Sequence, residues 1–183
     1  MWKTNQVGFT LAETAVVVAV ACILMAMAIP SFDEMYRSSN ADASAQLVAQ
    51  QLNYARALAV GSHGPVVFQI DPARNTIAVA VGTGSERGPL ALPGKMRFQS
   101  SAPALDTPDS LGSTVLGMGD HTALTFLDNG AAVADAVSNN LCSGTFFLQR
   151  QGGDASSRRA VTLLGGTGRV RIWRYDANNN GWK

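Results

Sequence analysis

The chain has 183 residues, 46% of them apolar, and a formal net charge of +1 at pH 7. This length suits one membrane helix and one modest globular domain, and it argues against a second domain. The two cysteines exclude a disulfide framework, because Cys22 lies in an apolar N-terminal stretch and Cys142 in the remote C-terminal part. We expect Cys142 to have no disulfide partner within the chain, and to be either a small buried residue with a free thiol or half of an intermolecular disulfide.

Residues 9–32 form the first predicted element, an apolar helix in which Glu13 is the only charge. At about 1.5 Å rise per residue the segment reaches roughly 36 Å, enough to cross a hydrocarbon core of about 30 Å. A carboxylate in lipid is unfavourable unless it meets a partner, so such residues are usually functional. A secretory signal is the alternative, since Lys3 precedes the apolar region, but a carboxylate does not belong near the start of that region.

The start of this helix, Gly8 followed by Phe9-Thr10-Leu11-Ala12-Glu13, resembles the class III signal of type IV prepilins and type II secretion pseudopilins. The resemblance implies a leader peptide of residues 1–8, cleavage after Gly8 by a prepilin peptidase, N-methylation of Phe9, and docking of Glu13 into a growing filament. Cleavage would leave an α-amino group on Phe9, in the same or a neighbouring copy, as the natural partner of the carboxylate. Because the leader contains Lys3, its loss reduces the 14 basic side chains to 13, equal to the 13 acidic ones.

The helix is expected to continue to about Gly61 as a soluble segment over residues 33–61. Apolar residues recur near a 3.6-residue period at Leu47, Leu52, Ala55 and Ala59. Pro30 removes one internal hydrogen bond and is expected to kink or loosen the helix. The segment around Pro30, Ala28-Ile29-Pro30-Ser31-Phe32, resembles the proline step of pilus-type subunits, and Tyr54-Ala55-Arg56-Ala57-Leu58-Ala59-Val60 resembles the FimT/FimU and GspH minor pilins.

Residues 62–183 are expected to form an antiparallel β domain, because short β-type runs alternate there with turn residues. The predicted strands are Val66 to Ile70, Thr76 to Val81, Lys95 to Gln99, Ala123 to Leu127, Thr145 to Gln149, Ala160 to Leu164 and Arg169 to Tyr175. Between Gln99 and His121 we expect a long loop. The fold class is therefore α+β and pilin-like, with a long N-terminal transmembrane helix before a β-sheet globular domain.

Catalysis is not expected, since no motif of a nucleophile, metalloprotease or paired Cys-x-x-Cys site is present. We predict no cofactor and no metal site. The two histidines, His63 and His121, stand in sequences typical of surface turns, and zinc would need three or four clustered ligands. The aspartates of the middle region fit no calcium loop, so solvated charge is the expected state of Asp106, Asp109, Asp120 and Asp128.

The C-terminal part is basic, with seven Lys and Arg residues against Asp154 and Asp176 over residues 150–183. A positive cluster of this kind attracts polyanions or acidic neighbours. Strand alternation in Gly168-Arg169-Val170-Arg171-Ile172-Trp173-Arg174-Tyr175 places Val170 and Ile172 on one face. The opposite face then presents an exposed stripe of guanidinium groups and aromatic rings, made of Arg169, Arg171, Trp173 and Tyr175.

This strand offers a candidate DNA site of Arg169, Arg171, Trp173 and Arg174, because guanidinium groups grip phosphates and aromatic rings stack on bases. Arg158 and Arg159 would widen the basic surface if the fold brings them near. Gly168-Arg169-Val170-Arg171 also resembles the Gly-Arg-x-Arg element of FimT-type minor pilins, which in that group is linked to DNA binding during natural transformation. The alternative is a solvated strand whose arginines pair with neighbouring subunits.

Together these patterns favour a minor pilin of a type IV pilus. It would be inserted in the inner membrane by one helix with a periplasmic β domain, and then enter the pilus. The resemblance implies a prepilin peptidase, other major and minor pilins and the pilus assembly machinery as partners. Three hypotheses remain open: a structural role in initiating or decorating the filament, a DNA-capturing module on it, and a GspH-type pseudopilin of a type II secretion system. The proline step favours the pilus.

Overall fold

The computed structural model describes residues 10–82, 84–99, 108–111, 115–117, 121–134, 140–153 and 155–183. The predictions for Gly8, Phe9, Asp106 and Asp120 lie outside these residues. The chain forms two compact units, Met1–Tyr36 and Arg37–Lys183, which are described separately.

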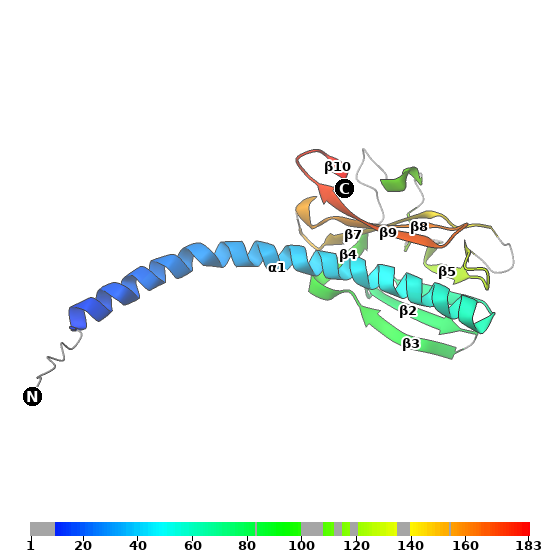
Figure 1. The fold of residues 1–183 in the computed structure, drawn as a ribbon, viewed down its shortest axis with the longest axis horizontal. Helices are drawn as coiled ribbons and strands as arrows, with labels where there is room; N and C mark the ends of the chain where they lie inside the picture. Colours follow the sequence, from blue (N-terminus) through cyan, green and yellow to red (C-terminus); the bar gives the residue numbers. More distant parts are fainter. Residues whose placement is uncertain are drawn as a thin grey trace, which may run out of the picture. The chain divides into compact units, whose positions relative to one another are not determined.

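Helix α1, Leu11–Ser62, is a single helix of 52 residues (Figure 1). Its N-terminus is a capping box: the backbone N–H of Glu13 donates to Thr10 Oγ1 at 3.3 Å, and the N–H of Thr10 donates to Glu13 Oε2 at 2.8 Å. The backbone stays helical through Pro30. The helix ends close to the predicted residue 61, where Gly64 donates to the carbonyl of Ala59 and His63 takes a φ of 51°.

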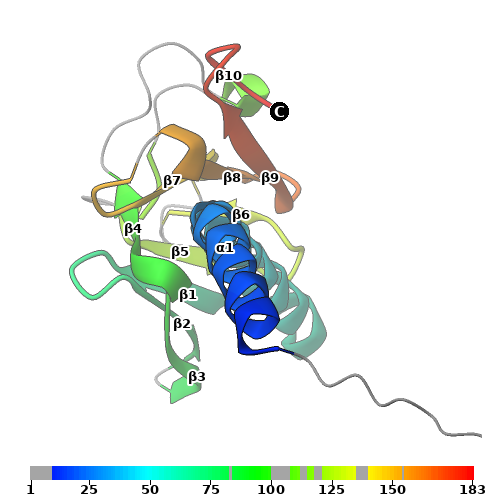
Figure 2. The ribbon, with the colours of Figure 1, turned by 90° about the vertical axis from the view of Figure 1, so that its left-hand side faces the viewer.

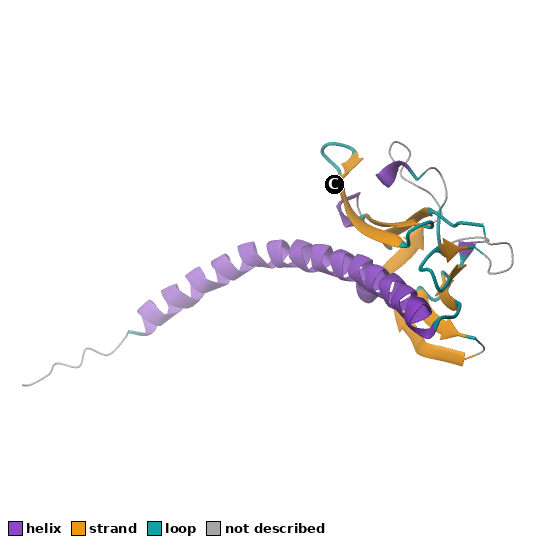
Figure 3. Ribbon diagram, turned by 45° about the vertical axis from the view of Figure 1, so that its right-hand side comes forward, coloured by secondary structure: helices purple, strands orange, loops and turns teal. Residues whose placement is uncertain are grey.

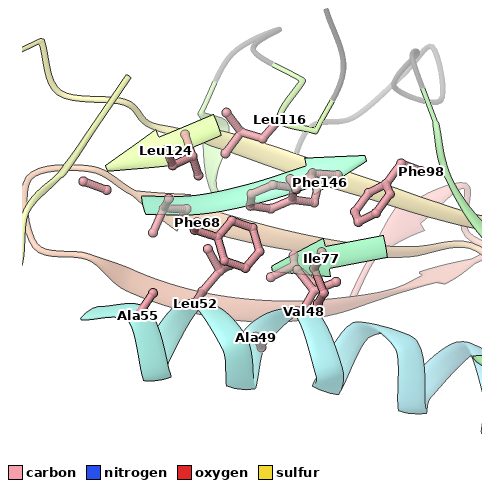
Figure 4. Close-up of a cluster of buried hydrophobic side chains, with 14 of the residues drawn as sticks. Val48, Ala49, Leu52, Ala55, Phe68, Ile77, Phe98, Leu116, Leu124 and Phe146 are labelled. Carbon is pink, nitrogen blue, oxygen red and sulfur yellow. The ribbon is translucent and has the colours of Figure 1, made fainter. Parts of the chain in front are cut away.

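In the second unit, one stripe of α1 is fully buried. The stripe follows spacings of three and four residues and consists of Ala41, Ala45, Val48, Leu52, Ala55 and Ala59. Most of its members are alanine, which lets the helix backbone approach the strands closely. Figure 4 shows Val48, Leu52 and Ala55 pointing from α1 toward the aromatic side chains of the β domain.

The first sheet has the strand order β3-β2-β1-β5-β6, with every pair antiparallel. Its strands are β1 Val66–Asp71, β2 Thr76–Val81, β3 Gly84–Ala91, β5 Ala123–Phe126 and β6 Ala132–Val133. Strands β1 and β2 alternate between more and less buried residues, since one face covers the core.

The second sheet has the order β10-β9-β8-β7-β4, also antiparallel throughout (Figure 2). Its strands are β4 Met96–Gln99, β7 Gly144–Arg150, β8 Arg159–Leu164, β9 Arg169–Asp176 and β10 Gly181–Trp182. Short 3₁₀ turns lie between strands, at η1 Pro93–Lys95, η2 Pro108–Ser110 and η4 Ala155–Ser157 (Figure 3).

The two sheets share one hydrophobic core with the part of α1 from Ala41 to Ala59. Phe68 of the first sheet and Phe146 of the second meet edge to face, with ring centroids 6.1 Å apart. Leu52 of α1 and Leu124 of β5 are also completely buried. Burying a side chain of this size stabilises the fold by about 1.5–3 kcal/mol.

The predicted fold class, a long apolar N-terminal helix followed by antiparallel β-sheets, is confirmed. All seven predicted strands exist, with bounds within about a residue or two. Three strands were not predicted: β3, β6 and β10. The sequence of β3, Gly-Ser-Glu-Arg-Gly-Pro-Leu-Ala, lacks alternation, and the other two strands have only two residues each.

The prediction of a long loop between Gln99 and His121 is corrected at Val115 and Leu116. Val115 forms a parallel bridge with Thr145, and Leu116 is fully buried in the core. This short segment therefore contributes to the fold. A lone pair of apolar residues between glycines carries no periodicity from which its burial could be predicted.

Candidate functional site

The first candidate site is the apolar surface of α1 between Leu11 and Tyr36. An 18-residue window in this helix has a mean hydropathy of 2.5, and none of it is buried, which distinguishes it from the core helix of a soluble protein. The large side chains stand in the open, among them Val16, Leu24 and Met27. By length and composition this helix can cross a membrane.

Glu13 lies at the N-terminal end of this apolar surface. Its Oε2 accepts from the backbone N–H of Thr10 at 2.8 Å and from the Thr10 hydroxyl at 2.9 Å. The described partner of the carboxylate is thus its own helix terminus, while the predicted amine of Phe9 lies outside the described residues. Sequence reasoning missed this cap, although Thr10-Leu11-Ala12-Glu13 has the Thr-x-x-Glu spacing that signals it.

The second candidate site is the basic strand β9, where the structure brings Arg169 and Arg171 together on Asp109. Arg171 Nη1 lies 3.0 Å and Arg169 Nη2 3.6 Å from Asp109 Oδ1. The other carboxylate oxygen, Oδ2, accepts from the Thr162 hydroxyl at 2.8 Å. Both arginines remain about half exposed, at 46% and 50%, whereas the Asp109 side chain is only 10% exposed.

This arrangement corrects the prediction that Asp109 is a solvated loop charge. Asp109 has a φ of 60° within η2, and its carboxylate forms the internal counter-charge of β9. The contact joins residues 62 positions apart in the chain, so no local pattern could reveal it. Asp128, by contrast, is exposed as expected.

The aromatic half of the predicted stripe is also corrected. Trp173 is half-buried, and its indole Nε1 donates to Thr162 Oγ1 at 3.1 Å. Tyr175 is buried, its ring centroid lies 5.1 Å from that of Trp182, and the guanidinium carbon of Arg158 lies 5.4 Å from the Tyr175 centroid. These rings hold the sheet together instead of forming an exposed stacking platform.

A second ion-pair cluster overturns the idea that Arg159 widens the basic surface. Its guanidinium is 1% exposed and donates from Nε to Asp42 Oδ1 of α1 at 2.5 Å. The same guanidinium donates to the backbone carbonyl of Ser156 and to the Ser38 hydroxyl. Arg174, which remains about half exposed, donates from Nη2 to the other Asp42 oxygen. Two arginines thus share one carboxylate and tie the strands to the helix.

The glycine of the Gly-Arg-x-Arg pattern is required by the fold. Gly168 has a φ of 62°, in the left-handed region that glycine adopts without strain. A Cβ at this position would collide with the carbonyl of Gly130 and would lie 2.7 Å from Cδ of Arg56. The glycine of this short motif is therefore explained by backbone conformation and packing alone.

The remaining polar candidates form no site. Cys142 is a free, buried thiol, and burial raises its pKa. His63 is exposed in the turn after α1, whereas His121 is half-buried, which corrects its predicted surface position. Among the residues that the structure describes, no group of three or more His, Cys, Asp or Glu side chains is placed to hold a metal.

No protein-family model and no curated protein matches the chain. Among solved structures, the chain is similar to the type IV minor pilin FimU of Pseudomonas aeruginosa, with 18% identity over 72% of this chain and 86% of that one, and a TM-score of 0.47. It is also similar to the minor pseudopilin EpsH of the type 2 secretion system of Vibrio cholerae, with 15% identity over 73% of this chain and 95% of that one, and a TM-score of 0.48. At such identities and TM-scores, neither likeness decides the function of this chain.

Proposed function

We propose that this chain is a minor pilin of a type IV pilus, incorporated through its N-terminal helix to initiate or decorate the filament. The observation that carries the proposal is the exposed apolar surface of α1, with Glu13 as its only charge between residues 9 and 32. Such a surface is unstable in water, so it requires lipid first and other apolar helices afterwards. Residues 8–13 resemble a class III signal. Processing at such a signal would prepare the helix to leave the membrane and enter the filament.

Glu13 acts in this proposal as the group that sets the register of docking. A carboxylate in an apolar helix assembly is strongly unfavourable unless it meets a positive partner. The α-amino group that cleavage after Gly8 would create on Phe9 of a neighbouring copy meets this need. The capping box holds the Glu13 carboxylate at the N-terminal end of the helix.

The chain would begin in the inner membrane, with one helix spanning the bilayer and the β domain in the periplasm. A prepilin peptidase, major and minor pilins and the assembly machinery would be its partners. The alternative role is a GspH-type pseudopilin of a type II secretion system, which uses the same helix and the same docking chemistry. Loss of secretion without a pilus defect in a deletion strain would favour that alternative.

DNA capture by β9 is a second candidate function, favoured by the half exposure of Arg169 and Arg171. The candidate DNA site has fewer available side chains than predicted, because Trp173 donates a hydrogen bond to Thr162 and Arg174 donates one to Asp42. Any phosphate must also compete with the Asp109 carboxylate for the two guanidinium groups.

Incorporation tests the main proposal. Glu13→Gln retains the size of the side chain but loses its charge, and Thr10→Ala is the matched control that weakens the capping box yet keeps the carboxylate. We expect both variants to insert in the membrane, and only Glu13→Gln to be depleted at least tenfold from sheared filaments. Equal incorporation of Glu13→Gln and wild type would refute docking through Glu13, and equal depletion of both variants would reduce Glu13 to a helix cap.

A further inference from the structure

The edge of the second sheet is left open along much of β9. Strand β10 pairs with β9 only at its end, where Gly181 faces Asp176 and Trp182 faces Tyr175 (Figure 2). Lys183 extends this pairing by one step, through two backbone hydrogen bonds with Arg174. Among the described residues, none pairs with β9 on this side between Arg169 and Trp173.

The hydrogen bonds around Arg174 show which backbone N–H and carbonyl groups of β9 point away from β8. Arg174 directs its N–H and carbonyl to Lys183, on the β10 side, whereas Tyr175 directs its N–H to Arg158, at the start of β8. Because successive residues of an antiparallel strand alternate in direction, Ile172 and Val170 point the same way as Arg174. Their N–H and carbonyl groups face the open edge.

This edge differs from the other sheet edges of the described structure, which are short or blocked. Strand β3 contains Pro89 and pairs with β2 through two register shifts, devices that discourage further pairing. Strand β6 has two residues, and the Phe98 N–H of β4 is already bonded to Asn75 Oδ1 at 3.2 Å. In contrast, β9 pairs with β8 without a shift from Arg169 to Arg174 and contains no proline.

A hollow of about 380 Å³ lies beside the same edge, between β9 and the Asp42 to Gln46 turn of α1. Ile172 lines this hollow and is 44% exposed, although strand alternation predicts it on the inward face with Val170. A strand added to β9 would send every second side chain toward the hollow and would cover Ile172. The unpaired backbone and the exposed isoleucine are independent observations at one place.

We propose that this free edge of β9 accepts an extended, acidic segment of a partner protein as an added β-strand. An open edge selects an extended segment through backbone hydrogen bonds, and its flanking side chains select the sequence. In the part of the chain that the structure describes, the ion pairs along β9 join the cations Arg159, Arg169, Arg171, Arg174 and Lys183 to the carboxylates Asp42, Asp109 and Asp176. The surplus of two positive charges favours a segment that carries Asp or Glu and disfavours one that carries Lys. This inference does not depend on incorporation into a filament.

The test uses the full chain in detergent micelles and a fluorescent ten-residue peptide of alternating Val and Glu, with a Val–Lys peptide of equal length as its counterpart. Ile172→Pro removes the outward N–H, which the sheet itself does not use, so the edge strand tolerates it. Ile172→Ala is the matched control that shortens the side chain but keeps the N–H. We expect the Val–Glu peptide to bind the wild type at least tenfold more tightly than the Val–Lys peptide. Binding should fall at least tenfold in Ile172→Pro and less than about threefold in Ile172→Ala.

Amide hydrogen exchange is measured on the wild type, so it tests the proposal even if Ile172→Pro does not fold. The amides of Val170 and Ile172 should exchange rapidly in the free chain and slow at least tenfold when the Val–Glu peptide is added. Absence of peptide binding, or binding that leaves both amides unprotected, would overturn the proposal. Equal competition by single-stranded DNA, with Ile172→Pro unaffected, would reassign the edge to nonspecific attraction of polyanions.

Discussion

The two parts of helix α1 are built for different surroundings. From Leu11 to Tyr36 the helix exposes large side chains such as Val18 and Leu24, whereas from Ala41 to Ala59 it buries a stripe composed mainly of alanine. Large exposed side chains maximise the apolar area available to lipid or to another helix, and small buried ones let a backbone lie close to a sheet. One continuous helix thus combines an exposed apolar surface with a structural element of a folded domain.

The charges in the two parts differ in the same sense. Asp42 is held by the guanidinium groups of Arg159 and Arg174 within the second unit. Glu13 has only the cap formed with Thr10 among its described contacts. Removing a charge whose partners lie within the domain leaves those partners uncompensated, while a charge without such a partner remains available for intermolecular pairing.

The largest expected effect comes from breaking the Asp42 cluster. Asp42→Ala leaves the buried guanidinium of Arg159 without its carboxylate, so we expect a loss of about 3–5 kcal/mol in the free energy of unfolding of the second unit. The measurement is thermal unfolding of the full chain in detergent, followed by tryptophan fluorescence. The double variant Asp42→Ala/Arg159→Met should recover most of the loss, and failure to recover it would mean that the cluster is not energetically coupled.

Two leucines, one in each part of α1, test whether the two parts differ in their contribution to the stability of the second unit. Leu52→Ala removes a fully buried side chain and should destabilise the second unit by about 2–5 kcal/mol. Leu24→Ala, on the exposed part, should change the same quantity by less than about 0.5 kcal/mol. A comparable loss in both variants, measured by the same unfolding experiment, would contradict the division of the helix into two roles.

The Asp109 counter-charge predicts a smaller effect on polyanion binding. Asp109→Asn removes the carboxylate that competes for Arg169 and Arg171, and an ion pair with a half-exposed arginine is worth about 1 kcal/mol at most. We therefore expect up to about fivefold tighter binding of single-stranded DNA at low salt. The double variant Arg169→Gln/Arg171→Gln should weaken binding and flatten its salt dependence. No change in either variant would remove β9 as a DNA site.

The smallest expected effect is an acid dependence at the C-terminal hairpin. The pKa of Asp176 is lowered because its carboxylate accepts hydrogen bonds from the Lys183 ammonium and the N–H of Asn178. A carboxyl group with a lowered pKa stabilises the fold above its unfolded value of 3.8, and this contribution is lost as the pH falls through the lower folded value. Asp176→Asn should make the unfolding temperature less sensitive to pH below about 4. A pH profile identical to the wild type would show that the pair is not coupled to folding.

The sequence predicted the helix and most strands because their signals are local. The buried positions Leu52, Ala55 and Ala59 repeat with the helical period, and β1, β2 and β8 are dense in β-type residues. Strand β3 escaped prediction because Gly88 and Pro89 interrupt it, and because its pairing with β2 leaves no local pattern in the sequence.

The candidate site was less predictable than the fold because its contacts are long-range. Arg159 and Asp42 are 117 positions apart, and Arg171 and Asp109 are 62 positions apart. A single charged residue in a sequence suggests a solvent-exposed side chain, so the ion pairs of Asp42 and Asp109 were missed. The alternation of β9 placed Arg169 and Arg171 correctly on one face. It could not show that Trp173 donates a hydrogen bond to Thr162, or that Tyr175 packs against Trp182.

If the exposed part of α1 enters a filament after processing, the N-terminal peptide of the assembled protein records both steps. Mass spectrometry of sheared, purified pili should identify a peptide of this chain that begins at Phe9 and carries one additional methyl group. Absence of the chain from the filament fraction, or a filament-bound chain that still begins at Met1, would contradict this account.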